Sequence, residues 1–363
     1  MKDGRTLKQG HLEQVAEWRE EKYRAPELRQ LFLELTLRCN ERCLHCGSSC
    51  GDVPSEELPV SVYKRLLDEV KEDFSPKLPQ LCITGGEPLL RKEFYEIMAY
   101  AHSLGFRWGM TTNGTLITKE VARRLADAGM GTVSVSLDGL QAQHDRLRQT
   151  PGGFEKALEG IRNLVNMGAF RHVQVTTVAH HGNLGDLDGL FALLDGIDVD
   201  SWRIINMEPI GRALEHPALM LTKDDFRYLF AYIREKRAQG YPLCYGCSHY
   251  LGPELEGELR DWYFLCTAGI YTASVMVNGD VGACLDIERR PETIQGNILQ
   301  TRFSEIWRSR FAVFRRDFSD LNETCRACPD RRFCAGDSKH SWDYDANRPL
   351  LCLRDTLWQA KTT

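Results

Sequence analysis

Long apolar runs are absent from the 363-residue chain, and this absence argues against two broad classes of protein. No stretch approaches the roughly eighteen apolar residues that a membrane-spanning helix needs. The first twenty residues, MKDGRTLKQGHLEQVAEWRE, contain no apolar core of the kind that a secretory signal carries. We therefore expect neither membrane insertion nor export, and the cytoplasm is the expected compartment.

Positive charge is not in excess either. The chain has 46 Lys and Arg against 51 Asp and Glu, which gives a net charge of −5. Such a balance provides no general electrostatic surface for nucleic acid. Repeats, low-complexity tracts and long charge runs are also missing. With 42% hydrophobic and 27% charged residues, the composition is that of a globular protein, and the length suits about two domains.

Cysteine, in contrast, is abundant, with 13 residues in the chain. The reducing cytosol disfavours disulfides in a protein without an export signal. The cysteines are also closely spaced, as in CNERCLHC (39–46) and CRACPDRRFC (325–334). Close spacing of this kind is typical of metal-ligand sets. The sequence therefore favours thiolates bound to metal over disulfides or scattered buried thiols.

Short β-rich runs alternate with amphipathic stretches from residue 31 to about residue 240. Strand alternating with helix predicts parallel strands joined by right-handed crossovers. We expect an α/β fold, a partial (β/α)6 TIM-type barrel, with a doubly wound sheet as the alternative. The runs expected to form strands are LFLELTL (31–37), QLCIT (80–84), RWGMT (107–111), TVSVSL (132–137), HVQVTTV (172–178) and SWRIIN (201–206).

Three segments are predicted along the chain. Residues 1–30 have the pattern of a helix followed by a linker, and residues 31–240 have that of the barrel. Residues 241–363 form a cysteine-rich segment with short predicted helices, and they contain eight of the 13 cysteines. We expect the boundary between two domains near residue 240.

The first cysteine cluster lies at the predicted end of the first strand. Cys39, Cys43 and Cys46 follow a C-x3-C-x2-C spacing. The C-terminal ends of the strands carry the active site in β/α barrels. Three thiolates can ligate three irons of a 4Fe–4S cube and leave the fourth open, and an open position is typical of a catalytic metal centre. The alternative is a zinc loop completed by Cys50 or His45.

Three further strand ends carry polar loops that contain glycine. The second predicted strand is followed by Gly85-Gly86-Glu87-Pro88, in which glycine permits close backbone approach to a ligand and proline suits the first turn of a helix. The third and fourth strands end in Thr112-Asn113-Gly114 and Ser136-Leu137-Asp138-Gly139. Each sequence alone is a common turn. Together with the cysteine loop they predict a binding site at one face of the barrel.

The ordered motifs CNERCLHC, GGEPLL, TTNGTL and SLDG resemble those of the radical S-adenosylmethionine (SAM) enzymes, over roughly residues 31–215. The resemblance implies a 4Fe–4S cluster on Cys39, Cys43 and Cys46, whose free iron chelates the amino and carboxylate groups of SAM. Such enzymes cleave SAM reductively to a 5′-deoxyadenosyl radical that abstracts a substrate hydrogen, while the protein supplies orientation. The residues expected to bind SAM are Gly85, Gly86, Glu87, Pro88, Asn113, Ser136, Asp138 and Arg148.

Several roles carry over from the resemblance position by position. The Gly85–Glu87 loop would meet the methionyl amino group, Ser136 the ribose or carboxylate, and Asp138 would support that loop. His45 would pack near the adenine. Arg148, in HDRLRQTPGGF, stands where relatives place a contact to the SAM carboxylate, with a surface arginine as the alternative.

The C-terminal cysteines resemble the SPASM extension of radical SAM enzymes, which normally carries two auxiliary 4Fe–4S clusters. Cys266 is followed by twelve residues, Gly279, four residues and Cys284, as in the first part of that pattern. The resemblance implies a complete second auxiliary cluster. Its expected ligands are Cys325, Cys328, Cys334 and Cys352.

The first auxiliary cluster departs from the pattern, because Ser338 stands where a further cysteine is expected. Cys266 and Cys284 remain as ligands, and the thiols left over by counting are Cys247 and Cys244, which we expect to complete the set. The alternative is a cluster on three thiolates, with Asp337, solvent or substrate at the fourth iron. Without the upstream half, a pair of zinc ribbons would explain this region equally well.

The other two cysteines are expected not to bind metal. Cys82 is expected to be a small buried residue within a strand, and Cys50 follows the first cluster.

Asp286, two residues past Cys284, is a candidate to take a proton at the substrate, as a carboxylate beside the matching cysteine is proposed to do in sulfatase-maturating relatives. A structural aspartate is the alternative, because the offset differs.

Three functions are weighed. The first is modification of a peptide or protein side chain, the second is radical chemistry on a small molecule such as a tetrapyrrole or sugar, and the third is a non-catalytic iron–sulfur electron-transfer or scaffold protein. An electron donor such as flavodoxin or ferredoxin is expected. The thirty N-terminal residues are too short for a leader-peptide recognition domain, so a separate recognition protein, or none, would serve. Neither nucleic acid nor membrane is an expected partner.

Overall fold

The computed structural model describes residues 2–51, 56–246 and 249–358. A ten-stranded sheet forms its framework, in the order β10-β9-β8-β1-β2-β3-β4-β5-β6-β7. The pairs from β8 through β1 to β7 are parallel, and β9 and β10 are antiparallel additions. The strands are β1 (Gln30–Glu34), β2 (Gln80–Thr84), β3 (Trp108–Thr112), β4 (Met130–Ser136), β5 (His172–Ala179), β6 (Ser201–Asn206), β7 (Leu243–Tyr245), β8 (Thr272–Val275), β9 (Asp280–Gly282) and β10 (Gly296–Asn297).

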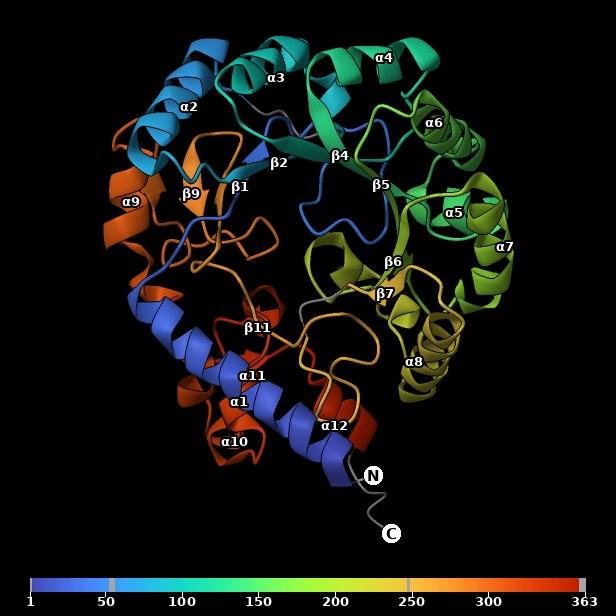
Figure 1. Ribbon diagram of the computed structural model, residues 1–363, viewed down its shortest axis with the longest axis vertical. Coiled ribbons are helices and arrows are strands. Elements are labelled where there is room, and N and C mark those ends of the chain that lie inside the picture. Colours follow the sequence, from blue (N-terminus) through green and yellow to red (C-terminus); the bar gives the residue numbers. More distant parts are fainter. Residues whose placement is uncertain (1, 52–55, 247–248, 359–363) are drawn as a thin grey trace.

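Helices cover the outer face of this sheet, which curves around the centre of the molecule (Figure 1). The outer helices are α2 (Val60–Phe74), α3 (Phe94–Ser103), α4 (Lys119–Asp127), α5 (Gln141–Arg148), α6 (Gly153–Met167), α7 (Leu187–Ile197) and α8 (Lys223–Ala238). The remaining helices are α1 (Lys2–Arg24), α9 (Phe303–Ser309), α10 (Glu323–Ala327), α11 (Arg331–Cys334) and α12 (Leu353–Trp358), and a small antiparallel pair joins β11 (Trp342–Asp343) to β12 (Arg348–Pro349).

Single 3-10 turns connect several of these elements. They are η1 (Pro88–Leu90), η2 (Leu184–Asp186), η3 (Gly211–Glu215), η4 (Pro217–Leu219), η5 (Phe311–Val313), η6 (Phe318–Leu321) and η7 (Lys339–Ser341). Among the helices that the structure describes, none combines the length and apolarity needed to cross a membrane.

The strand order confirms the α/β fold with a parallel sheet and excludes the doubly wound alternative. A doubly wound sheet reverses its strand order at a switch point, whereas β1 to β7 follow one another in sequence around the sheet. All six predicted strands are present. Sequence analysis did not predict β7 or the strands from β8 to β10.

The two faces of the strands differ in character, because successive side chains point to opposite sides. On the outer side, Trp108 packs edge-on against Phe94 of α3, and Trp202 against Tyr232 of α8. Burial of these apolar side chains holds the helices on the sheet. The inner side is only half-buried and largely polar, and it includes Cys82, Thr84, Ser134, Ser136, Gln174 and Arg203.

The C-terminal segment is joined to the barrel through the sheet and through α1. Strand β8 pairs in parallel with β1, with Gln30 opposite Thr272. Helix α1 runs alongside α11 (Figure 1), and Arg19 donates to the carbonyl oxygen of Phe333 at 2.8 Å. The hydrogen-bonded sheet therefore continues across the boundary predicted near residue 240. The division into two domains at that point stays a prediction.

Candidate active site

The loop that follows β1 brings three thiols together at the carboxyl end of the sheet. Burial raises the pKa of Cys39 to about 11, with the Glu87 carboxylate adding to the effect. Burial also raises the pKa of Cys43, and the thiols of Cys46 and Cys39 are among the groups that act on it. The protonated form is thus favoured for Cys39 and Cys43 until a cation arrives, and thiolate is the form that binds iron.

Cys50 is not remote from this cluster. Its thiol donates a hydrogen bond that lowers the pKa of Cys46 to about 6, and its backbone N–H lies 3.3 Å from the Cys46 Sγ. None of the twelve cysteines that the structure describes forms a disulfide. Three converging soft donors without a disulfide fit an iron–sulfur cluster.

A buried ion network holds the cysteine loop from behind. Arg148 donates from Nη1 to Glu41 Oε2 at 2.8 Å and from Nε to Asp138 Oδ2 at 2.8 Å. Its Nη1 also lies 3.8 Å from the Cys43 Sγ. Arg148 is only 5% exposed, so the surface-arginine alternative is wrong. The guanidinium of Arg148 already donates to two carboxylates. Its contact with SAM stays a prediction. Glu41, between two cysteines of the motif, was missed by sequence analysis.

Asp138 anchors the same network at the end of β4. Burial alone would raise its pKa, but Arg148, with help from His45 and His144, lowers the pKa of Asp138 to about 2. The other carboxylate oxygen accepts a hydrogen bond from the Val178 backbone at 2.8 Å. The ionised Asp138 therefore ties β4 to β5 at the loop that it was predicted to support.

His45 and Ser136 lie beside Asp138. The His45 Nε2 stands 3.8 Å from the Asp138 Oδ2, and burial lowers the pKa of His45 to about 4. His45 is therefore a neutral ring packed inside the loop. Ser136 ends β4 on the half-buried inner face. Their predicted contacts with adenine and ribose stay predictions.

The Gly85-Gly86 pair lies against the cysteine loop itself. A Cβ at Gly85 would stand 2.3 Å from the Thr36 carbonyl oxygen, and one at Gly86 would stand 2.1 Å from that of Arg38. The Gly86 N–H donates to the Thr36 oxygen at 2.8 Å. Glycine is needed here because two backbone segments cross, in addition to any approach by a ligand.

Glu87 links the second and third strand ends. Its fully buried carboxylate accepts from the Thr112 hydroxyl at 2.9 Å and from the Asn113 N–H at 2.9 Å. Burial raises the pKa of Glu87 to about 7. Asn113 in turn donates from Nδ2 to Asn40 Oδ1 at 2.8 Å, and Pro88 begins the 3-10 turn η1 as predicted. The predicted SAM-binding loops therefore form one connected surface around the three thiols.

A second group of thiols gathers in the C-terminal segment. Burial raises the pKa of Cys334, and the thiols of Cys352, Cys325 and Cys328 all act on it. Cys325 lies in α10 and Cys328 directly follows it, Cys334 ends α11, and Cys352 directly precedes α12. This is the four-thiol set predicted for the second auxiliary cluster, and its donors fit that group.

The remaining thiols are divided. Cys266 is among the groups that raise the pKa of the half-buried Cys284, so these two lie close together. Cys244 lies on β7, where burial raises its pKa and the guanidinium groups of Arg203 and Arg237 oppose that rise. Cys247 lies outside the described residues. Completion of this cluster by Cys244 and Cys247 stays a prediction.

Ser338 and Asp337, at the departure from the SPASM pattern, have partners of their own. The buried Ser338 hydroxyl lies 2.7 Å from the His340 Nδ1. Asp337 accepts from the Tyr250 N–H at 2.9 Å, and its other oxygen lies 2.8 Å from the His249 Nδ1. Asp337 is therefore engaged with histidine, and its alternative role as a ligand of the fourth iron stays a prediction.

Asp286 lies between the two halves of the site. Its Oδ2 is 3.9 Å from the Cys284 Sγ, and its Oδ1 is 3.5 Å from the position of a Cβ at Gly47, next to Cys46. This position lies within reach of both thiol regions. Its role as a proton acceptor stays a prediction.

Known proteins give the same assignment as this geometry. Residues 33–194 match the Radical SAM superfamily, and residues 266–329 match SPASM, described as an iron-sulfur cluster-binding domain. The AdoMet-dependent heme synthase of Methanosarcina barkeri is 32% identical over 352 residues, which cover 91% of this chain and 97% of that protein. The chain belongs to the radical SAM superfamily.

Other relatives of this radical SAM protein include peptide-modifying enzymes. The mycofactocin maturase MftC of Mycolicibacterium smegmatis is 32% identical over 321 residues, which cover 84% of this chain and 76% of that protein. Among solved structures, Streptococcus suis SuiB bound to S-adenosylmethionine has a TM-score of 0.71 at 18% identity, covering 88% of this chain and 76% of that chain. The anSMEcpe structure with bound AdoMet has a TM-score of 0.70 at 20% identity, covering 90% and 94%. These two likenesses show the fold.

The protein is therefore a radical SAM enzyme. It uses SAM with a 4Fe–4S cluster, and its SPASM domain carries auxiliary iron–sulfur clusters. Membership of this enzyme family argues against zinc at the cysteine clusters and against a non-catalytic scaffold protein. The fold class, the enzyme class and the cofactors expected from sequence are confirmed.

Proposed function

We propose that the enzyme acts on an iron tetrapyrrole, in a step that forms haem or its precursor. The observation that carries this proposal is the near full-length similarity to the M. barkeri heme synthase, of which the chain spans 97%. A second relative from M. barkeri, Fe-coproporphyrin III synthase, is 30% identical over 294 residues. This proposal places the small-molecule function ahead of the peptide function that sequence analysis put first.

The polar side chains on the inner face of the barrel are suited to a substrate that carries charged groups. The Ser134 hydroxyl lies 2.7 Å from the Thr176 hydroxyl, and Arg203 donates from Nε to Thr176 at 3.1 Å. Arg203 is half-buried on this face. A guanidinium in a partly desolvated site binds carboxylates well, and the porphyrins named in these relatives carry carboxylate side chains.

The chain's own residues hold and orient the reactants. Cys39, Cys43 and Cys46 would hold the catalytic cluster, which with SAM supplies a 5′-deoxyadenosyl radical when bound. The buried pairs of Arg148 with Glu41 and Asp138 fix the backbone of the cysteine loop. Because Arg148 and its partners are desolvated, the loop keeps one geometry behind the reacting centre.

For a peptide substrate, the second candidate below, loss of a hydrogen atom to the 5′-deoxyadenosyl radical and of an electron to an auxiliary cluster would release a proton, which Asp286 is proposed to accept. Its carboxylate stands beside Cys284 and close to Gly47. Positioned general bases contribute about 10²–10⁴-fold to rate. We expect Asp286→Asn to slow product formation by about 10²-fold or more, with release of 5′-deoxyadenosine still detectable. Unchanged product formation would assign Asp286 a structural role.

The test is turnover by the reconstituted, oxygen-free enzyme with SAM, a strong reductant and iron coproporphyrin III. We expect this porphyrin to raise the release of 5′-deoxyadenosine and to yield a haem-type product, as measured by liquid chromatography and mass spectrometry. The Cys43→Ala variant is the control that must give neither product. Release of 5′-deoxyadenosine without any change in the porphyrin would overturn the proposal.

A peptide substrate is the second candidate, favoured by the 32% identity to MftC and by neighbours solved with peptides. These are SuiB with its precursor peptide SuiA and anSMEcpe with the Cp18Cys peptide. Short reading frames beside the gene would supply peptides for the same assay. A flavodoxin or ferredoxin electron donor, a separate recognition protein and a cytoplasmic location remain part of the proposal.

A further inference from the structure

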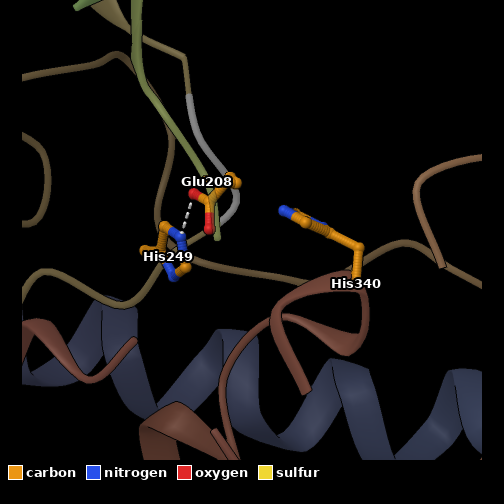
Figure 2. Close-up of side chains that lie close together, drawn as sticks. All are labelled: Glu208, His249 and His340. Carbon is orange, nitrogen blue, oxygen red and sulfur yellow. Dashed lines mark hydrogen bonds and ion pairs between the residues drawn. The ribbon is translucent and has the colours of Figure 1, made fainter. Parts of the chain in front are cut away.

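Three potential metal ligands converge beside the site, from parts of the chain far apart in sequence. Glu208 follows β6, His249 follows β7, and His340 lies in η7 (Figure 2). One ligand atom from each lies within 4.8 Å of the other two. The two imidazole rings have centroids 6.1 Å apart.

We propose that Glu208, His249 and His340 bind one divalent transition-metal ion, separate from the iron–sulfur clusters. Two imidazoles and one carboxylate form a donor set that suits Zn²⁺ or Fe²⁺. Three protein ligands leave at least one coordination position open, which is characteristic of catalytic rather than structural sites.

Neighbouring oxygens engage the Nδ1 atom of both histidines, so that the Nε2 atom can face a metal. The Asp337 Oδ2 lies 2.8 Å from the His249 Nδ1, and the Ser338 Oγ lies 2.7 Å from the His340 Nδ1. Metal-binding histidines commonly donate one ring N–H to such an oxygen, which fixes the tautomer and directs the other nitrogen at the ion. In both residues this other nitrogen is Nε2. Ser338 thus supports a histidine where the SPASM pattern has a cysteine.

Glu208 supplies the negative charge. Its Oε1 accepts from the Asn206 Nδ2 at 2.9 Å and lies 2.5 Å from the His249 Nε2. Its Oε2 is buried and has no hydrogen-bond partner among the described residues. A buried carboxylate oxygen without a partner is unfavourable. A cation at this position would satisfy that oxygen.

A modest movement closes the site. Ligand atoms about 2.0–2.2 Å from one ion lie roughly 3–4 Å from each other, and the three ligand atoms already lie within 4.8 Å of one another. His340 is half-buried and approaches from the side opposite Glu208 and His249, so rotation of its side chain can shorten the distances (Figure 2). His249 would exchange its hydrogen bond to Glu208 for a bond to the metal. Its contact with Asp337 would persist.

The position of the ion suggests its use. Glu208 is followed by Pro209 and Ile210, and the Ile210 side chain lies 3.2 Å from the position of a Cβ at Gly47, in the cysteine loop. An ion on Glu208 is therefore close to the catalytic loop. Its open position would take an anionic oxygen, such as a substrate carboxylate. That last assignment rests on the proposed function, whereas the metal site does not.

The test uses Zn²⁺ alone as the probe, on holoenzyme with its iron–sulfur clusters assembled and loosely bound metals removed. We expect about one zinc per chain beyond the clusters. In His340→Ala the zinc affinity should fall by at least about 100-fold, because loss of a ligand exceeds the roughly 10–100-fold effect of losing an outer partner. Asp337→Asn should weaken binding by that smaller factor.

Glu208→Gln provides a second variant that keeps the shape of the side chain, and His181→Ala is the matched control. His181 is an exposed histidine paired with Asp225, outside this cluster. Iron and sulfide are counted in the same samples. Loss of zinc with iron unchanged would support the site. The proposal is overturned if the wild type binds no extra zinc, if both ligand variants bind like the wild type, or if zinc falls only together with iron.

Discussion

The two thiol-rich regions of the molecule form metal-binding donor sets in different ways. In the barrel, Cys39, Cys43 and Cys46 come from one loop, and the buried Arg148 fixes that loop through Glu41 and Asp138. In the C-terminal segment, four thiols lie in or directly beside three short helices, spread over residues 325–352. We therefore expect the barrel to hold its loop without metal, whereas the C-terminal segment has little regular structure to replace its cluster.

The largest effect is expected from removal of the barrel trio. The combined variant Cys39→Ala/Cys43→Ala/Cys46→Ala should abolish SAM cleavage and lose about four of about twelve irons per chain, with the thermal unfolding temperature little changed. Iron analysis, liquid chromatography of 5′-deoxyadenosine and thermal unfolding measure the three quantities.

Cys82→Ala is the matched control for this prediction. Burial raises the pKa of Cys82 to about 12, and it lies within β2 on the inner face, away from any predicted ligand set. Its iron content should equal that of the wild type. Retention of all the iron in the triple variant would contradict the assignment of the trio.

The second effect addresses the other side of the comparison. Cys325→Ala/Cys334→Ala should remove the second auxiliary cluster and expose the C-terminal segment to protease, because metal binding contributes directly to folding where little else orders the chain. Limited proteolysis with mass mapping measures this. Cleavage should concentrate beyond about residue 300 in this variant and not in the barrel-trio variant. Equal resistance of both variants would show that the C-terminal segment folds without its cluster.

The same contrast between local and distant contacts explains what the sequence could predict. The cysteine trio, the Gly85–Pro88 loop and the Asn113 and Asp138 turns each lie within a short segment directly after a strand, so local pattern was enough. The order of the strands also followed from their alternation with helices, and the sequential sheet confirms it.

Contacts between distant segments were not predictable in this way. Glu41 meets Arg148 across 107 positions, and His249 meets Asp337 across 88. Strand β8 completes the sheet beside β1 although 242 positions separate Gln30 from Thr272. A buried charge has no local signature, because only its partner makes burial tolerable. The Glu208 cluster was missed for this reason.

The third effect is the loss of the buried arginine. Arg148→Met should destabilise the protein by about 3–5 kcal/mol, because it leaves the buried Glu41 and Asp138 without their cation. Urea unfolding of the wild type and the variant at neutral pH measures the difference. Arg123→Ala, an exposed arginine paired along α4, is the control and should change little. A wild-type stability in Arg148→Met would show that the network does not hold the loop.

The smallest effect concerns Glu87, whose carboxyl group connects two strand ends in the barrel. Burial raises its pKa from 4.5 to about 7 in the folded state. A carboxyl group with a raised pKa binds its proton more tightly when folded, so its contribution is full below about pH 4.5 and is lost as the pH rises toward 7. The free energy of unfolding of the wild type should therefore fall between pH 5 and 8 relative to that of Glu87→Gln. The total fall is about 1.4 kcal/mol for each unit by which the folded-state pKa exceeds the unfolded-state pKa. Urea unfolding across this range measures the slope, and parallel curves for the two proteins would mean that Glu87 remains ionised throughout.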